Sequence, residues 1–241
     1  MSRLSWILGG GAVAAYLWYD LKKPHSASSP AGPTNLEPLE GRWLWPVAMW
    51  NGRAPVISDG FNSPRPGVPH HGGVDIMFRR QPADPFKAGT SNGSKGHVMP
   101  DNIPALAASD GVVVSAMKGS RGYSVIVDHA PRKVSTFYTH LERLLVAPTA
   151  RGESRQRVRA GQPLGIIGFD PTDPARIRHL HFEIWRGGPA DAVDPQPLMA
   201  SWGTVPEPHG PFVAARNAGR RGDLVQVSAH ARSWPGTALR R

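Results

Sequence analysis

The sequence predicts a mainly β domain with a metal site, on the strength of two observations. Glycine and proline contribute 27 and 25 of the 241 residues, a turn-rich composition that suits many short strands. Residues 178–185 (RHLHFEIW) are rich in aromatic and β-branched side chains, which is typical of a strand, and they include two histidines. A chain of this length is sufficient for one domain with its own core and with extensions at its ends.

The two histidines of this predicted strand, His179 and His181, are separated by one residue. Side chains on a strand alternate between the two faces of a sheet, so we expect both imidazoles on the same face. A divalent metal is a common partner for such a pair, and Zn²⁺ accepts neutral imidazole nitrogen readily. The alternative is a solvent-exposed pair without a metal, so the interpretation depends on further ligands elsewhere in the chain.

A second segment, residues 70–76, contains two histidines, two glycines and an aspartate. If this segment is extended, His71 and Asp75 lie four residues apart on one face of a strand. The intervening glycines disfavour a helix and let the backbone pass close to a site. His70 is the alternative ligand, but the spacing favours His71. Two histidines and one aspartate would leave a fourth zinc position for water, as in catalytic rather than structural sites.

A third segment, residues 136–141 (TFYTHL), places His140 at the end of a predicted strand. The chain contains no cysteine, which excludes disulfides and thiolate-bound zinc. Any metal must therefore be bound by histidine and carboxylate groups.

Together these motifs resemble those of the lysostaphin-type (LytM-domain) zinc endopeptidases, which cut peptide bonds in bacterial cell-wall peptidoglycan. The resemblance covers roughly residues 55–200 and implies a twisted antiparallel sheet or incomplete β-barrel, with the metal site in a groove on its concave face. The motifs, in the order in which the family has them, are His71-Gly-Gly-Val-Asp75, Tyr138-Thr-His140-Leu141 and His179-Leu-His181-Phe-Glu183.

The resemblance also implies a role for each of five residues. By it, His71, Asp75 and His181 bind one Zn²⁺ per chain. His140 and His179 are the catalytic residues, which activate the attacking water and stabilise the transition state. The implied reaction is zinc-dependent hydrolysis of a peptide bond in the stems or cross-bridges of peptidoglycan.

Other features have both a functional and a structural interpretation. Glu183 shares the face of the two histidines and either hydrogen-bonds a ligand imidazole or lies in solvent. The stretch 77–102, rich in proline and glycine, is predicted to be a loop rather than a packed element. It either borders the substrate groove or is a tolerated surface insertion. The remaining single histidines are interpreted as surface or satisfied core residues: His25, His97, His129, His209 and His230.

The N-terminal segment predicts a helical membrane anchor. Residues 4–19 are apolar apart from Ser5, and as a helix they would rise roughly 24 Å, somewhat short of a bilayer core of about 30 Å. Charged residues separate this stretch from the nearest small-residue sequence, which favours an uncleaved anchor over a signal peptide. The expected organisation is an anchor at 1–23, a flexible linker at 24–40, a zinc peptidase domain at 41–202 and a basic C-terminal tail at 203–241.

The formal net charge of +10 favours attraction to an anionic envelope without naming one partner. The sequence contains no nucleic-acid-binding motif, so no specific nucleic acid is expected. We expect peptidoglycan as substrate and the membrane as partner of the N-terminal helix, with the catalytic domain in the periplasm or a virion. Two alternatives stay open. One is a non-catalytic member of the fold that binds peptidoglycan or activates an amidase, and the other is a lytic component of a phage or larger envelope assembly.

Overall fold

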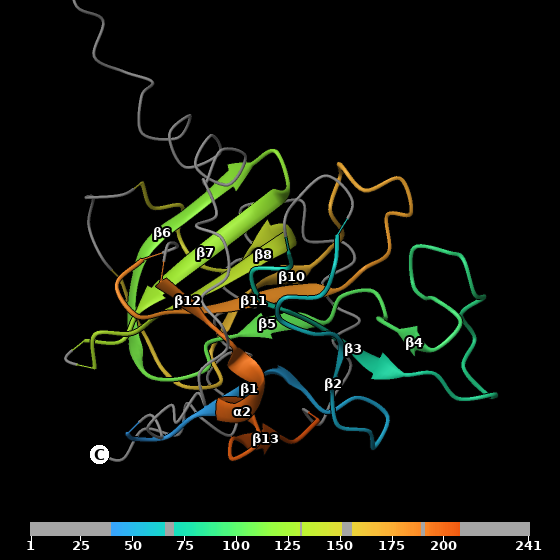
Figure 1. Cartoon of the computed structure of the whole chain (residues 1–241), viewed down its shortest axis with the longest axis horizontal. Coiled ribbons are helices and arrows are strands. Elements are labelled where there is room, and N and C mark those ends of the chain that lie inside the picture. The colour runs from blue at the N-terminus through green and yellow to red at the C-terminus, as the bar shows by residue number, and fades with distance from the viewer. Residues whose placement is uncertain (1–39, 66–69, 131, 151–155, 189–190, 208–241) are drawn as a thin grey trace, which may run out of the picture.

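The computed structural model describes residues 40–65, 70–130, 132–150, 156–188 and 191–207 (Figure 1). The predicted anchor at 1–23, nearly all of the linker and most of the basic tail lie outside these residues. No helix in the described part of the chain has the length and apolar character that crossing a bilayer requires. The described elements in chain order are β1 Leu44–Ala48, β2 Val56–Asp59, β3 Val74–Arg79, β4 His97–Val98, β5 Pro104–Leu106, β6 Gly111–Gly119, β7 Gly122–Asp128, β8 Ser135–Leu144, β9 Gln156–Val158, β10 Pro163–Ile167, β11 Leu180–Trp185, β12 Ala192–Val193, α2 Pro195–Met199 and β13 Gly203–Val205.

An 11-stranded sheet forms most of the domain, as the mainly β prediction requires. Its main path runs β2-β3-β11-β8-β7-β6-β9, with every neighbour antiparallel. The described strands end at β2 on one side and β9 on the other, so the sheet is open rather than a closed barrel. A separate pair, β1 and β13, is parallel, and it brings Gly203–Val205 from the predicted tail region against the start of the domain.

Strand β11 shows why the two faces of the sheet differ. Its apolar residues Leu180, Phe182 and Ile184 are fully buried, and Phe182 packs against Tyr138 of β8 with ring centroids 5.3 Å apart. The alternate residues, which include His181 and Glu183, therefore point to the opposite face. The apolar side holds the strand in the core, and the polar side is left available for a site.

Strand β8 contains an irregularity at His140. Two register pairs, Tyr123 with Leu141 and Val125 with Tyr138, set three steps of β8 against two of β7, which is a β-bulge. His140 has a φ of 63°, in the left-handed region. The expectation that His140 lies at a strand end is therefore wrong, because it lies within a ten-residue strand. In a regular strand His140 would lie on the same face of the sheet as Tyr138, two residues earlier. The bulge turns the His140 side chain away from that face.

The stretch 77–102 is more ordered than its composition predicted. Its first residues belong to β3, β4 pairs with the end of β3, and Val98 and Met99 are fully buried. We refer to residues 80–102 as the insert, which projects from the end of β3 beyond the rest of the sheet (Figure 1). The prediction of a loop is confirmed for residues 80–96, which contain no helix or strand. It is wrong for the two ends of the stretch, because proline and glycine mark where a chain turns, and not what the turns pack against.

Candidate functional site

Strand pairing places Asp75 beside His181. The two residues are register partners on the neighbouring strands β3 and β11. His71 reaches the same place from a bend before β3 rather than from an extended strand, and its backbone is held by hydrogen bonds to Asn62 and Ser63. The bend passes so close to β11 that a Cβ on Gly73 would lie 2.4 Å from the carbonyl oxygen of Phe182.

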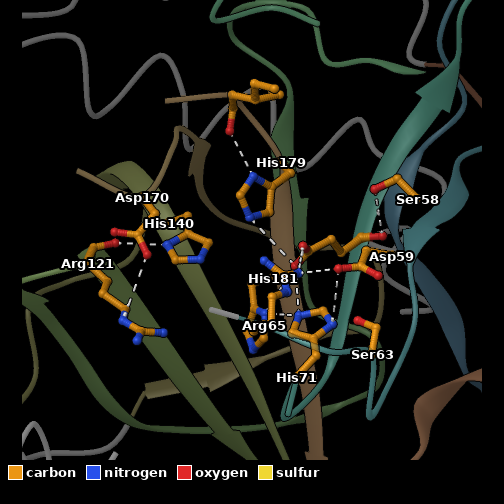
Figure 2. A network of polar contacts seen from close by, with 12 residues as sticks. Ser58, Asp59, Ser63, Arg65, His71, Arg121, His140, Asp170, His179 and His181 are labelled. Carbon is orange, nitrogen blue, oxygen red and sulfur yellow. Dashed lines mark hydrogen bonds and ion pairs between the residues drawn. The ribbon is translucent and has the colours of Figure 1, made fainter. Parts of the chain in front are cut away.

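Three ligand-type atoms meet at this point, two of them from His71 and His181, which Figure 2 shows side by side. The Nε2 atom of His71 lies 2.9 Å from Nδ1 of His181, and each nitrogen lies 3.1 Å from Oδ1 of Asp75. Ligands about 2.0–2.1 Å from a tetrahedral zinc ion lie roughly 3.3 Å from one another. The triangle therefore has nearly the size of one face of a zinc coordination tetrahedron. We call His71, Asp75 and His181 the trio.

Hydrogen bonds on the far side of each ring fix where the protons are. Nδ1 of His71 lies 2.7 Å from the carbonyl oxygen of Gly60, and Nε2 of His181 lies 2.8 Å from a carboxylate oxygen of Glu183. Carbonyl and carboxylate oxygens only accept, so these two nitrogens carry the hydrogens. In the neutral rings the opposite nitrogens direct their lone pairs at Asp75 Oδ1. Three electron-rich atoms facing one point repel one another unless a cation lies between them, and this donor set suits zinc.

The other oxygen of Asp75 is occupied by an arginine. Arg65 pairs with Oδ2 of Asp75 and, at 2.6 Å, with Asp59. Burial opposes the charge of Arg65, but the two carboxylates outweigh it and raise the pKa of the guanidinium. Arg65 leaves only Oδ1 of Asp75 free to face the histidines. Arg65 could not be assigned to the site from the sequence, because nothing in the sequence shows which acidic residue it pairs with.

The pKa values of Asp75 and His181 in the trio depend strongly on neighbouring charges. Burial disfavours a charged Asp75, but when the neighbouring rings carry a second proton, the charge of His179 and hydrogen bonds from His181 and His71 hold the pKa of this carboxyl well below its usual range. Burial also disfavours a charged His181, yet the carboxylates of Asp75 and Glu183 raise its pKa to about 9. A cation bound by the trio therefore has to compete with a proton for the same lone pairs.

The two remaining histidines of the motifs lie next to the trio. Nε2 of His179 is 3.6 Å from Oδ1 of Asp75, and its Nδ1 donates to the carbonyl oxygen of Ile177 at 2.8 Å. The ring of His140 packs edge-on against that of His179, with centroids 4.8 Å apart, and its Nδ1 donates to the carbonyl of Arg121 at 3.1 Å (Figure 2). In both rings Nδ1 makes the hydrogen bond to the backbone, which leaves the lone pair of Nε2 available.

Burial and the neighbouring charges of His179 and His181 lower the pKa of His140 to about 3. The ring is consequently neutral at neutral pH. Arg121 and Asp170 lie on the far side of His140, with Arg121 Nε 3.8 Å from Asp170 Oδ2 (Figure 2).

Gly168 joins the backbones of the two non-trio histidines. Its N–H donates to the carbonyl oxygen of His140 at 2.7 Å, and its own carbonyl accepts the N–H of His179 at 3.1 Å. A Cβ at this position would lie 2.9 Å from the carbonyl oxygen of His140. Sequence reasoning missed Gly168, because a glycine at a strand end looks like an ordinary turn residue.

All five predicted site residues therefore lie together, and His71 rather than His70 completes the trio. Glu183, for which two interpretations were open, is hydrogen-bonded to the ring of His181. It also accepts the indole N–H of Trp185 at 2.5 Å. His129 is a satisfied core residue, as expected: it is fully buried and its Nδ1 donates to the carbonyl of Asp110.

Comparison with known proteins places these residues in context. Residues 93–195 match the sequence profile of Peptidase family M23. The matched range includes His140, His179 and His181, whereas His71 and Asp75 precede it and are separated from it by most of the insert. The fold brings the two parts together.

Two curated relatives and one solved structure are similar to this chain. A lipoprotein NlpD/LppB homolog of Pseudomonas aeruginosa is 45% identical over 94 residues, 38% of this chain and 28% of that protein. The peptidoglycan DD-endopeptidase ShyA of Vibrio cholerae is 34% identical over 121 residues, 49% of this chain and 26% of that protein. The matches thus span about a quarter of the length of these relatives. The catalytic domain of lysostaphin from Staphylococcus simulans is 22% identical, with a TM-score of 0.41 over 63% of this chain and 95% of that one.

Proposed function

We propose that this chain, whose residues 93–195 match peptidase family M23, is a zinc-dependent endopeptidase of the lysostaphin type. Its substrate would be a peptide bond in the stems or cross-bridges of bacterial peptidoglycan. One observation carries the proposal. Nε2 of His71, Oδ1 of Asp75 and Nδ1 of His181 lie within 3.1 Å of one another, with the ring hydrogens directed away.

The trio would hold one Zn²⁺ per chain through these three atoms. Zinc bound there supplies a Lewis acid that polarises the scissile carbonyl and lowers the pKa of a water molecule. Three protein ligands leave a fourth position for that water or for substrate, which is the arrangement of a catalytic rather than a structural site.

His140 and His179 would move the protons. Because Nδ1 of His140 donates to the carbonyl oxygen of Arg121, the lone pair of its Nε2 is left to take a proton from the attacking water. Nε2 of His179 lies 3.6 Å from Oδ1 of Asp75, beside the same space, where it would stabilise the transition state. The proton taken from the water would be the one that the two imidazoles deliver to the leaving amine. The carbonyls of Arg121 and Ile177 hold both rings in the orientation that these roles need.

The proposal is tested with the full chain, loaded with zinc, on purified peptidoglycan. Chromatography and mass spectrometry of the released fragments should show new amino and carboxyl ends at one type of peptide bond, with the glycan intact. A chelator should stop the release and added zinc should restore it. Release of fragments with new reducing sugar ends, or no release at any zinc concentration, would contradict the proposal.

The non-catalytic alternative predicts a different result in the same assay. A binding or amidase-activating protein of this fold would sediment with peptidoglycan but release nothing by itself. The complete set of trio residues and neighbouring histidines favours the enzyme, since a binding protein has no need of a zinc site with a vacant position.

We also propose that the protein works in the cell envelope with its peptidase domain facing peptidoglycan. The basis is the apolar segment at residues 4–19 together with the substrate proposed above. Fractionation of cells that carry the full chain, or a chain lacking residues 1–23, should show membrane attachment only for the former. Recovery in purified virus particles instead of membranes would favour a role as a phage lytic component.

A further inference from the structure

Arg178, the residue immediately before His179, is the centre of a polar cluster outside the motifs. Its side chain is only 14% exposed. Its Nη1 donates to Glu142 of β8 at 2.7 Å and to the carbonyl oxygen of Ile167 at the end of β10 at 2.9 Å. Its Nε lies 2.9 Å from a carboxylate oxygen of Asp101 in the insert, an ion pair that lacks the geometry of a hydrogen bond. One side chain therefore ties three segments that are distant in the sequence.

Two of these contacts lie next to the residues that would move protons. Glu142 is two residues after His140 on β8, beyond the bulge. Ile167 precedes Gly168, whose backbone hydrogen-bonds both His140 and His179. The Arg178 side chain thus binds two positions beside this backbone connection: Glu142, close to His140, and Ile167, next to Gly168.

The insert is held against the domain at two places. In its first part, Arg53 pairs with both oxygens of Asp84 at 2.9 and 2.7 Å, and Phe86 packs against Trp50 with ring centroids 6.1 Å apart. In its middle, the carbonyl oxygen of Ser91 accepts the backbone N–H of Arg178 at 2.7 Å. The insert is therefore packed against the domain, and its hydrogen bond to Arg178 links its position to the residue before His179.

We propose that Arg178 is a positioning residue, which fastens the insert to β8 and β10 and so sets His140 and His179 relative to the trio. The inference rests on the proposed peptidase function. The described contacts of Arg178 fall on the insert, β8, the end of β10 and Phe169 rather than on the trio, so its removal should spare metal binding. It should instead alter the alignment of the proton-transferring rings, on which rate depends steeply.

A matched control lies on the same loop. Arg176 is exposed and its guanidinium lies 4.5 Å from the ring centroid of Phe169, which the guanidinium of Arg178 also approaches, at 6.0 Å. Arg178→Gln and Arg176→Gln remove the same charge from neighbouring positions. Only the first removes the contacts to Glu142 and Asp101.

The kinetic test uses the full, zinc-loaded chain with a soluble cross-linked muropeptide as substrate. We expect Arg178→Gln to bind one zinc per chain and to keep KM within about 3-fold, while kcat falls roughly 10- to 100-fold. Arg176→Gln should stay within about 2-fold of the unsubstituted chain in both constants. Equal kcat for the two variants, a rise in KM alone, or loss of zinc from Arg178→Gln would overturn the proposal.

A double-mutant cycle tests whether Arg178 acts through the insert. Asp101→Asn alone should lower kcat, and Asp101→Asn combined with Arg178→Gln should be no slower than Arg178→Gln alone, since both remove the same connection. Multiplication of the two losses would show that the residues act independently.

A readout without turnover separates this inference from the proposed function. Amide hydrogen exchange should become faster in Arg178→Gln, but not in Arg176→Gln, in peptides that cover residues 91–101 and 168–181. Unchanged exchange in both segments would refute the positioning role. If the unsubstituted chain hydrolyses nothing, the peptidase proposal fails while the exchange result still decides whether Arg178 fastens the insert.

Discussion

Asp75 and His181 face each other across neighbouring strands, and the register that pairs them leaves Oδ1 of Asp75 3.1 Å from Nδ1 of His181. Two members of the trio are thereby held by the hydrogen bonds of a sheet rather than by loops. Sites built on such elements keep their geometry more closely than sites on loops. The third member, His71, depends on a bend, so the close passage of that bend against β11 is the most vulnerable part of the site.

Replacement of Gly73 by alanine should disturb this passage. An added Cβ would lie 2.4 Å from the carbonyl oxygen of Phe182 and 2.7 Å from Cγ of Glu183, so the bend or β11 must move. We expect a loss of about 1–3 kcal/mol in the free energy of unfolding, together with weaker zinc binding. Denaturant unfolding and a zinc-competition titration measure the two effects.

Gly96→Ala is the matched control, since no atom lies within 4 Å of the Cβ that it adds. If Gly73→Ala and Gly96→Ala bind zinc equally well, the bend does not set the position of His71.

Glu183 should tune metal binding without being a ligand. Glu183→Gln removes the negative charge that faces Nε2 of His181, 2.8 Å away, while keeping a similar shape. Loss of such a hydrogen-bonding partner typically weakens metal affinity by roughly 10- to 100-fold. Competition with a chromophoric chelator measures the change, and the exposed Glu207→Gln serves as control. An affinity equal to that of the control variant would refute this role.

Tyr138 belongs to the second motif but should serve the fold rather than the reaction. It is fully buried, and its hydroxyl accepts the N–H of Ala108 at 2.8 Å and lies 3.0 Å from the hydroxyl oxygen of Thr136. Tyr138→Phe leaves the N–H of Ala108 without its partner, so the free energy of unfolding should fall by about 1–3 kcal/mol. Turnover per folded molecule should be unchanged at a temperature where the variant is folded. A large fall in kcat would instead show that the hydroxyl takes part in the reaction.

His129 should make the fold sensitive to mild acid. Burial lowers the pKa of this ring, whose Nδ1 donates to the carbonyl of Asp110 and whose Nε2 lies 2.8 Å from the Thr136 hydroxyl. The unfolded chain takes up a proton near pH 6.5, whereas the folded chain does not, so stability falls as the pH drops below about 6.5. This one group can change the free energy of unfolding by at most about 1.4 kcal/mol per pH unit.

His129→Gln removes the titration, so its unfolding free energy should fall less between pH 6.5 and 5 than that of the unsubstituted chain. Urea unfolding at a series of pH values measures the difference. Parallel curves for the two proteins would show that His129 does not contribute to the pH dependence.

The part of the site on β11 was predictable because its residues follow the two-residue period of a strand. Alternation along β11 places Leu180, Phe182 and Ile184 in the core and leaves His181 and Glu183 on the other face. Each of the three motifs lies within a few residues, so short-range pattern was sufficient to find them.

The remaining features depend on contacts that are distant in sequence. The bulge at His140 arises from a mismatch of register with β7, and no local pattern encodes that mismatch. The packing of the insert depends on Arg53 and Trp50, about 30 residues earlier than Asp84 and Phe86. Arg178 likewise looks like a solvated arginine until its partners on β8, β10 and the insert are known.

The central claim, that the trio binds one catalytic zinc ion, is tested most directly by measuring the metal content of the purified full chain and two single variants. After equilibration with zinc and removal of the excess, elemental analysis should find about one zinc per chain in the unsubstituted protein and in His140→Ala, and none in folded His181→Ala. Only the unsubstituted protein should digest peptidoglycan. A folded protein without stoichiometric metal, or undiminished digestion by His140→Ala, would contradict the account.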